Sequence, residues 1–171
     1  MHVWVLGPSG AGKTTLTEGL HNLLGCDTVQ VGELLRSTYN EEQILNYNIP
    51  ESEIFSIVSS KVKKGDTNLK IIDGFPTNII QLNAWENCFS LPELVLVLEA
   101  SEEILVQRKL HRGRIDDTAC ISQTRKLRYD FETLPVLQYL SSKNLVQSLN
   151  SNASRKEVLE KAFHKIRGKF L

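Results

Sequence analysis

Short, uninterrupted runs of apolar residues recur along the chain, with longer amphipathic stretches between them. A continuous apolar run, rather than an alternation of apolar and polar residues, is typical of a strand buried on both faces of a parallel sheet. Turn-forming residues bound each run. We therefore expect five strands, at Val3–Leu6, Thr28–Val31, Leu69–Ile72, Leu94–Leu98 and Leu145–Leu149.

The stretches between these runs have apolar residues at helical spacing and carry helix boundary signals. Gly25 ends the first helix, because glycine readily adopts the left-handed backbone of a C-terminal cap. Ser154 and Glu157 form an S-x-x-E capping box for the last helix. Pro135 should kink the long sixth helix or split it in two. The expected helices are Lys13–Leu24, Glu33–Thr38, Ser52–Lys64, Ile79–Phe89, Glu102–Arg112, Thr118–Ser142 and Arg155–Phe170.

Strands that alternate with helices require crossover connections, which predict a three-layer α/β fold with helices on both faces of a parallel five-stranded sheet. The length of 171 residues suits one domain, residues 1–171, with a substantial core. We see no internal repeat, low-complexity tract or interdomain linker. The whole chain is therefore expected to form a single unit.

The link between the first strand and the first helix, Gly7–Thr14, has the sequence G-x-x-x-x-G-K-T. In this setting glycines let successive backbone N–H groups turn inward, and the N-terminus of a helix faces the same point. Lys13 adds a positive charge, and the Thr14 hydroxyl can face Mg²⁺. The pattern predicts a P-loop that binds the phosphates of a nucleotide rather than a glycine-rich turn without a ligand.

The third expected strand is followed directly by Asp73, in the segment Asp73-Gly74-Phe75-Pro76. In P-loop enzymes an aspartate at such a strand end holds Mg²⁺, directly or through water. The alternative is a helix cap or turn residue. The position at the carboxyl end of a parallel strand favours the metal role, shared with Thr14.

Arginines are concentrated within eighteen positions in the second half of the chain. A solvated helix face is the usual meaning of such a run. However, Gly113 interrupts it and Asp116-Asp117 follow, which indicates a short loop that presents guanidinium groups. Guanidinium groups suit the bidentate binding of phosphate oxygens and the charge of a transferring phosphoryl group. These residues are Arg108, Arg112, Arg114 and Arg125.

The composition excludes several classes of protein. Lys+Arg 20 and Asp+Glu 20 leave no net charge, so a strongly basic nucleic-acid surface is absent. Cys26, Cys88 and Cys120 are widely spaced, so neither a disulfide framework nor a zinc site is indicated. The chain starts directly with the P-loop strand, leaving no room for a signal peptide, and no apolar run has membrane-spanning length. We expect a monomer in the cytoplasm, with a nuclear location left open.

Four motifs occur in the order found in adenylate kinases and UMP/CMP kinases: Gly7–Thr14, Gly32–Arg36, Asp73–Pro76 with Gln81, and Arg112–Asp117. The chain resembles this family over nearly its whole length. The resemblance implies transfer of the γ-phosphoryl group of ATP to a nucleoside monophosphate (NMP), with Mg²⁺. It also implies an NMP-binding segment at about residues 32–64 and a lid at about residues 112–118.

The resemblance also implies roles for individual residues. Those that supply catalytic charge are Lys13, Arg112, Arg114 and Arg125. Those that bind ATP are Gly7, Ser9, Gly10, Ala11, Gly12, Lys13, Thr14, Thr15, Arg108 and Ala153. Those that bind the NMP are Val31, Arg36, Ile49, Gly74, Thr77, Gln81, Arg114 and Arg125.

The chain departs from the family pattern mainly where the acceptor should bind. Thr77 stands where the family usually has an arginine that contacts the acceptor phosphate, and the stretch between Arg36 and Pro50 is short. The lid lacks the few residues that short-lid members carry, and Gly-Lys-Thr-Thr replaces the family's Gly-Lys-Gly-Thr. Without this arginine, we expect phosphate binding or the reaction rate to be roughly ten- to a hundredfold lower.

The acceptor base is weakly determined by these residues. Gln81 favours AMP, because its carboxamide offers a donor and an acceptor to the adenine edge. Asn78 and Trp85 are closer to UMP/CMP kinases. We predict an ATP-dependent NMP kinase that favours AMP. The alternatives are a UMP/CMP or deoxynucleoside monophosphate kinase, a P-loop kinase with another acceptor, and a nucleotide-binding module with little catalysis.

Overall fold

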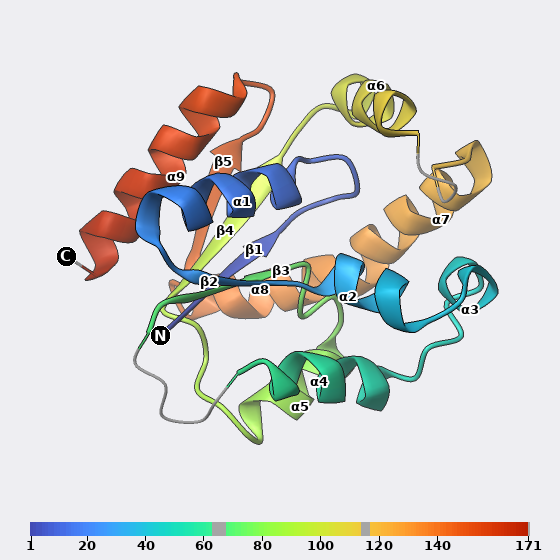
Figure 1. Ribbon diagram of the computed structural model, residues 1–171, viewed down its shortest axis with the longest axis horizontal. Helices are drawn as coiled ribbons and strands as arrows, with labels where there is room; N and C mark the ends of the chain where they lie inside the picture. Colours follow the sequence, from blue (N-terminus) through green and yellow to red (C-terminus); the bar gives the residue numbers. More distant parts are fainter. Residues whose placement is uncertain (63–67, 114–116, 171) are drawn as a thin grey trace.

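The computed structural model describes residues 1–62, 68–113 and 117–170. Its sheet has five parallel strands in the order β2-β3-β1-β4-β5 (Figure 1). Every expected strand is present, with each end within one residue of its predicted position. The three-layer α/β prediction is therefore confirmed. The strands are β1 (His2–Leu6), β2 (Asp27–Gln30), β3 (Lys70–Asp73), β4 (Leu94–Glu99) and β5 (Val146–Asn150).

Helices occupy the connections between the strands, and three of them begin and end where the sequence predicts. These three are α1 (Lys13–Leu24), α6 (Glu102–Arg112) and α9 (Arg155–Phe170). The other helical elements in the described part of the chain are α2 (Val31–Thr38), α3 (Glu41–Leu45), α4 (Glu51–Ser60), α5 (Ile79–Glu86), α7 (Ala119–Arg128), the π-helix η1 (Tyr129–Thr133) and α8 (Leu134–Ser142).

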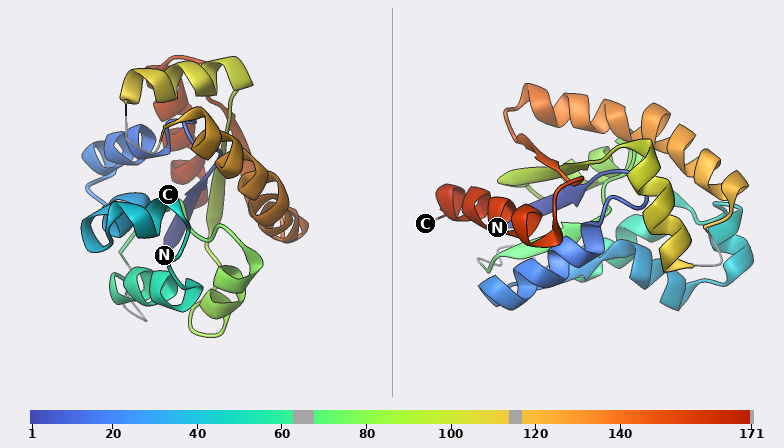
Figure 2. Two further views of the ribbon diagram at one scale, coloured as in Figure 1. Left: turned by 90° about the vertical axis from the view of Figure 1, so that its right-hand side faces the viewer. Right: turned by 90° about the horizontal axis from the view of Figure 1, so that it is seen from above.

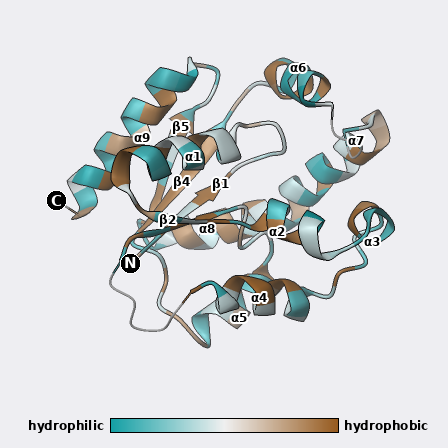
Figure 3. Cartoon of the chain, viewed as in Figure 1, coloured by the Kyte–Doolittle hydropathy of each residue, from teal (hydrophilic) through white to brown (hydrophobic). Residues whose placement is uncertain are grey.

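The two faces of the sheet carry separate apolar cores. Successive side chains of a strand point to opposite faces, so Val3 and Val5 pack under α1 and α9, whereas Trp4 and Leu6 pack against α4, α5 and α8. Figure 2 shows these two layers of helices from two further directions. Figure 3 shows hydrophobic residues along the central strands and hydrophilic residues along much of α9. Both faces of β1 are buried, which explains its continuous apolar run.

The expectation of strands buried on both faces is wrong for the two edge strands. β1, β3 and most of β4 are buried, but β2 carries the exposed Asp27. β5 exposes Gln147, Ser148 and Asn150. The helical layers cover the centre of the sheet more completely than its edges, so polar side chains are tolerated there.

Several helix boundaries differ from the expected ones. The helix expected at 52–64 begins at Glu51 and ends at Ser60, and residues 63 and 64 lie outside the described part of the chain. The helix expected at 79–89 ends at Glu86. The short helix α3 was not expected at all. Its signal is an N-x-x-Q capping box, in which Gln43 N donates to Asn40 Oδ1 at 2.9 Å and Asn40 N donates to Gln43 Oε1 at 3.3 Å.

The long helix expected at 118–142 is divided into α7, η1 and α8, as the prediction for Pro135 required. Proline lacks an N–H group and its ring crowds the carbonyl four residues earlier. The wide π-helical turn Tyr129–Thr133 stands directly before the first turn of α8, which contains this proline. The turn places Tyr129 and Thr133 in the wall of the large cavity described below.

Candidate active site

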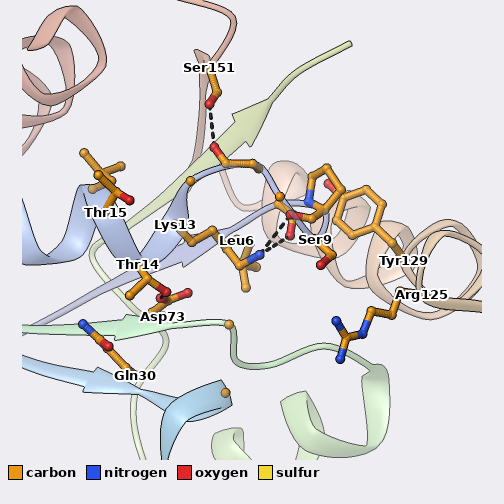
Figure 4. A pocket seen from close by; sticks show the side chains of 18 of the residues that line it. Leu6, Ser9, Lys13, Thr14, Thr15, Gln30, Asp73, Arg125, Tyr129 and Ser151 are labelled. Atoms are coloured by element: carbon orange, nitrogen blue, oxygen red, sulfur yellow. Dashed lines mark hydrogen bonds between the residues drawn. The ribbon is translucent and has the colours of Figure 1, made fainter. Parts of the chain in front are cut away.

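A cavity of about 1190 Å³ lies at the edge of the sheet where the strands end. Open parallel sheets bind ligands at this edge, outside the carboxyl ends of their strands. The cavity is bounded by the loop after β1, by the ends of β2 and β3, by the loop after β5 and by segments of α2, α4, α6 and α7. Figure 4 shows part of this wall, with Gln30 and Asp73 at the ends of β2 and β3 and Arg125 across from them. One continuous space therefore connects the predicted ATP and NMP sites.

The P-loop backbone lies tightly against β4 and α6. Gly7 and Gly10 have φ values of 145° and 91°, in which L side chains are strained. A Cβ atom at Gly7 would lie 2.6 Å from the carbonyl oxygen of Leu98, and one at Gly10 would lie 2.8 Å from that of Leu105. Only glycine fits at these two positions. Glycine there lets the loop backbone follow a tight path, which leaves space for a phosphate group in front of the N-terminus of α1.

Lys13 is the first residue of α1, and its ammonium group turns back over the loop. Nζ donates to the carbonyl oxygens of Gly7 at 2.8 Å and Pro8 at 3.1 Å (Figure 4). The charge is therefore held at the mouth of the loop, beside the N–H groups at the start of α1. This arrangement concentrates positive potential where phosphates would bind.

Thr14, in the first turn of α1, contacts Asp73 at the end of β3. β1 and β3 are parallel partners, with Val5 opposite Asp73. Thr14 Oγ1 donates to Asp73 Oδ2 at 2.9 Å, and Asp73 is buried. A hydroxyl and one carboxylate fit Mg²⁺, which takes one or two carboxylates and completes its shell with waters and phosphate oxygens. The alternative role of Asp73 as a helix cap does not apply to α5, whose N-cap is Asn78.

Arg108 connects α6 to the loop that follows β5. Its Nη1 donates to Ser151 Oγ at 2.9 Å and its Nη2 donates to the Ser151 carbonyl oxygen at 2.7 Å. Ser151 Oγ in turn donates to the carbonyl oxygen of Ala11 in the P-loop. Thr15 and Ala153 also line the cavity. Ser151 was not among the predicted site residues, although it lies in the Asn150–Ala153 stretch that carries part of the resemblance.

Two of the predicted lid arginines meet at one carboxylate. Arg112 donates to Asp117 through Nε at 2.9 Å and through Nη2, in a bidentate arrangement, and Arg125 Nη1 lies 3.9 Å from Asp117 Oδ1. The Asp117 side chain is only 4% exposed, so the charges are closely associated. Figure 4 shows Arg125 reaching into the cavity from the side opposite α1. Arg114 and Asp116 lie outside the described residues.

The predicted NMP-binding residues are only partly brought together. The cavity wall includes Arg36, Gly74, Thr77 and Gln81. Val31 does not line it, because this side chain is buried in the core beneath α4 and α5. Ile49 does not line it either, although its neighbours in the same stretch do. Exposed Arg36 is the acceptor-phosphate candidate among these residues.

Gln81 is buried, at 3% exposure, and its carboxamide is hydrogen bonded at both ends. Its Oε1 accepts from Thr77 N at 2.7 Å and from Thr77 Oγ1 at 3.2 Å. Its Nε2 donates to Glu51 Oε2 at 2.6 Å, while Glu51 Oε1 accepts from Asn78 Nδ2 at 2.8 Å. Residues from α4 and from the segment that begins α5 therefore form one polar network in the cavity wall.

Sequence reasoning missed several residues of this wall. Arg128 donates to Glu132 Oε2 at 2.8 Å, lies 4.0 Å from Glu51 Oε1, and places its guanidinium carbon 4.4 Å from the centre of the Tyr47 ring. The i, i+4 spacing of Arg128 and Glu132 is a signal that could have been recognised. Glu51 carries no signal, because an acidic residue in the first turn of a helix is ordinary.

Two residues of η1 line the cavity, Thr133 on the acceptor side and Tyr129 beside Ser9 of the P-loop (Figure 4). Thr133 Oγ1 donates to the carbonyl oxygen of Thr77 at 2.8 Å. Burial, helped by the nearby Glu99 and Asp130 carboxylates, raises the pKa of Tyr129 to about 12. The Tyr129 phenol is therefore neutral in the wall at physiological pH, and it can donate a hydrogen bond but not act as an anion.

Comparison with known proteins gives consistent matches. A family model described as an AAA domain matches residues 6–121. An adenylate kinase of Parasynechococcus marenigrum (strain WH8102) is 31% identical over 170 residues, which cover 91% of this chain and 93% of that protein. Adenylate kinase 1 of Nostoc sp. (strain PCC 7120 / SAG 25.82 / UTEX 2576) is 29% identical over 168 residues, covering 90% of this chain and 91% of that protein.

Proposed function

The chain belongs to the adenylate kinase family, and we propose that it transfers the γ-phosphoryl group of ATP to a nucleoside monophosphate, with AMP as the favoured acceptor. One observation carries this proposal. A single cavity contains a P-loop with its Thr14–Asp73 pair at one end and the Gln81 carboxamide network at the other.

The donor end supplies positive charge and orientation. The P-loop backbone and the N-terminus of α1 hold the β- and γ-phosphates, and Lys13 exchanges its carbonyl partners for phosphate oxygens. Thr14 and Asp73 would hold Mg²⁺, which neutralises phosphate charge when bound. Ala153 and the Arg108–Ser151 contact form the side of the cavity next to the ATP base.

The acceptor end holds the attacking phosphate group in position. An oxygen of the acceptor phosphate forms a bond to the γ-phosphorus while the bond from that phosphorus to the β–γ bridging oxygen breaks, releasing ADP. The acceptor phosphate is already an anion, so no side-chain base is needed. Arg36 orients it, and Arg112 and Arg125, with Arg114 of the lid, stabilise the charge that develops on the transferring group.

Two features that pointed to pyrimidines are explained by the core of the protein instead. Trp85 is fully buried, packs edge-on against Trp4 with ring centres 5.5 Å apart, and donates to the Ser90 carbonyl oxygen. Asn78 caps α5 and donates to Glu51, and it does not line the cavity. Neither residue lines the cavity, whereas Gln81 does, so the preference for AMP rests on Gln81.

We also propose that the protein acts as a monomer in the cytoplasm, on small nucleotides rather than on nucleic acid. The formal net charge of zero supports this, because nucleic-acid binding depends on a basic surface. None of the described helices is long and apolar enough to cross a membrane.

An acceptor screen tests the function. ADP formation should be measured with ATP and Mg²⁺ against AMP, CMP, UMP, GMP and dTMP, each as the only acceptor. We expect the highest kcat/KM with AMP. Gln81→Ala should lower the kcat/KM for AMP by a larger factor than that for any other monophosphate. A higher kcat/KM with CMP or UMP would overturn the AMP assignment, and no transfer to any monophosphate would leave a nucleotide-binding module.

A further inference from the structure

The chemistry of its neighbours fixes which way the Gln81 carboxamide points. The backbone N–H of Thr77 can only donate, so the atom facing it at 2.7 Å is the amide oxygen. An ionised carboxylate can only accept, so the atom facing Glu51 at 2.6 Å is the amide nitrogen. Reversing the amide would place like groups against each other at both ends. An isolated glutamine can turn its amide to suit different bases, but Gln81 is held in one orientation.

The remaining hydrogen-bonding capacity of the network is therefore defined. Gln81 Oε1 accepts two hydrogen bonds from Thr77, which occupy both of its lone pairs. Gln81 Nε2 has used one of its two hydrogens on Glu51 and keeps one. The Glu51 carboxylate accepts one amide hydrogen at each oxygen and keeps one lone pair on each. Glu51 lines the cavity, and its side chain is 26% exposed.

A carboxylate in this wall distinguishes bases by their exocyclic groups. Adenine, cytosine and guanine carry an amino group that can donate to a carboxylate, whereas uracil and thymine carry only carbonyl oxygens on their ring carbons. The single N–H donor of those two bases lies between two carbonyl oxygens, which a carboxylate repels. In adenine and cytosine the amino group also stands next to a ring nitrogen that can accept the remaining Gln81 hydrogen.

We propose that Glu51 is the specificity-determining residue of the acceptor site, and that together with Gln81 it selects monophosphates whose base carries an exocyclic amino group. The inference rests on the proposed function and adds to it, because it makes Glu51 rather than Gln81 alone the discriminating group. It also separates two bases that a UMP/CMP kinase would accept together. CMP should be an acceptable substrate and UMP a poor one.

Arg128 and Tyr47 support this role of Glu51. Arg128 forms only a long ion pair with Glu51, at 4.0 Å, because it donates at 2.8 Å to Glu132 and its guanidinium group stacks over the Tyr47 ring. The closest donors to Glu51 are thus two neutral amides, which orient the carboxylate without neutralising its charge. A fully neutralised carboxylate would discriminate much less against carbonyl oxygens.

The test begins with the unmodified protein. The kcat/KM values for AMP, CMP, UMP and dTMP should be measured with ATP and Mg²⁺, together with the affinities of AMP and UMP by calorimetry without ATP. We expect the kcat/KM values for AMP and CMP to exceed those for UMP and dTMP by roughly a hundredfold, the upper end of the effect of leaving one polar group without its hydrogen bond. UMP equal to or better than CMP would overturn the proposal.

The variant Glu51→Gln provides the second half of the test. A carboxamide can donate to a carbonyl oxygen, so the AMP-to-UMP ratio of kcat/KM should fall at least tenfold. Glu53→Gln is the matched control, because Glu53 lies in the same first turn of α4 but accepts from the Tyr39 hydroxyl, away from the cavity. It should leave the AMP-to-UMP ratio of kcat/KM unchanged.

The possible failures are distinguishable. An unchanged ratio in a Glu51→Gln protein with a normal melt overturns the role of Glu51 while the kinase function stands. If Glu51→Gln does not fold, the substrate ratios of the unmodified protein decide alone. If no monophosphate accepts a phosphoryl group, the proposed function fails, and calorimetric binding of AMP against UMP still tests the selection.

Discussion

The two ends of the cavity are built in different ways. The donor end consists mainly of backbone: a glycine-dependent loop follows the buried strand β1, and the neighbouring buried strand β3 delivers Asp73. The acceptor end consists of side chains that hydrogen bond across three separate elements, from Glu51 on α4 to Gln81 on α5 and Thr133 on η1. The donor end lies over the centre of the sheet, whereas the acceptor end lies among helices at one face.

This difference explains why one end follows the family pattern and the other departs from it. A phosphate site made of N–H groups needs a particular backbone path, and glycine positions such as Gly7 cannot change without collision. A base site made of side chains can be rebuilt by single substitutions. Thr77 in place of arginine is one such substitution, and its hydroxyl now contributes to the Gln81 network.

The largest effect should come from Lys13 at the donor end. Lys13→Met removes the charge aimed at the phosphates, and removal of one such electrostatic donor typically lowers kcat by about 10²–10³. The thermal melt should change little, because Lys13 is only half-buried and its Nζ donates to carbonyl oxygens of its own loop. Lys156→Met is the control, since that side chain is 86% exposed on α9. Unchanged ADP production in Lys13→Met would show that the loop does not act as a phosphate site.

A second change at the donor end concerns the metal. Asp73→Asn keeps the hydrogen bond with Thr14 possible but removes the negative charge, so activity or metal affinity should fall roughly 10- to 100-fold. The Mg²⁺ concentration needed for half-maximal rate should rise, and a titration of Mg²⁺ at fixed ATP measures it. Asp27→Asn at the opposite edge of the sheet is the control, because Asp27 pairs there with Lys70. An identical Mg²⁺ titration for Asp73→Asn and the unmodified protein would contradict the metal role.

The contrast between the two ends also accounts for what the sequence could and could not predict. The strands, α1 and Asp73 were predictable, because continuous apolar runs and a contiguous motif depend on neighbouring residues. The separation of α7 and α8 was predictable from Pro135, but the π-helical form of the intervening turn was not. Glu51 was not predictable as a site residue, because its role depends on two amides about thirty positions away that only the fold brings together.

At the acceptor end, Thr77→Arg should produce a smaller and opposite change. The backbone contacts of residue 77 with Gln81 and Thr133 would remain, and the new guanidinium could bind the acceptor phosphate in a bidentate manner. We expect kcat/KM for AMP to rise roughly tenfold, as for one hydrogen bond to a charged group. Thr77→Val is the control, because it loses the hydroxyl without adding charge. A loss of activity, or no change, would mean that the short segment before α4 has displaced the phosphate from its family position.

The smallest effect is expected at the cap of α9, next to the donor end. Ser154 N donates to Glu157 Oε2 at 2.9 Å, and the Ser154 hydroxyl donates to the same oxygen at 2.7 Å. These bonds lower the pKa of Glu157 below its ordinary value. A carboxyl group whose pKa is lower in the folded state stabilises the fold above its unfolded pKa, and this contribution is lost as the pH falls through the folded value. Ser154→Ala should therefore lower the melting temperature by a constant amount at neutral pH, and the difference from the unmodified protein should narrow below about pH 4.

The same variant tests whether the donor end depends on its backbone alone. If that backbone is rigid, kcat and the KM for ATP should not change in Ser154→Ala, even though the cap directly follows Ala153 in the cavity wall. A rise in the KM for ATP would show instead that this end also depends on a side-chain contact, and would weaken the contrast between the two ends.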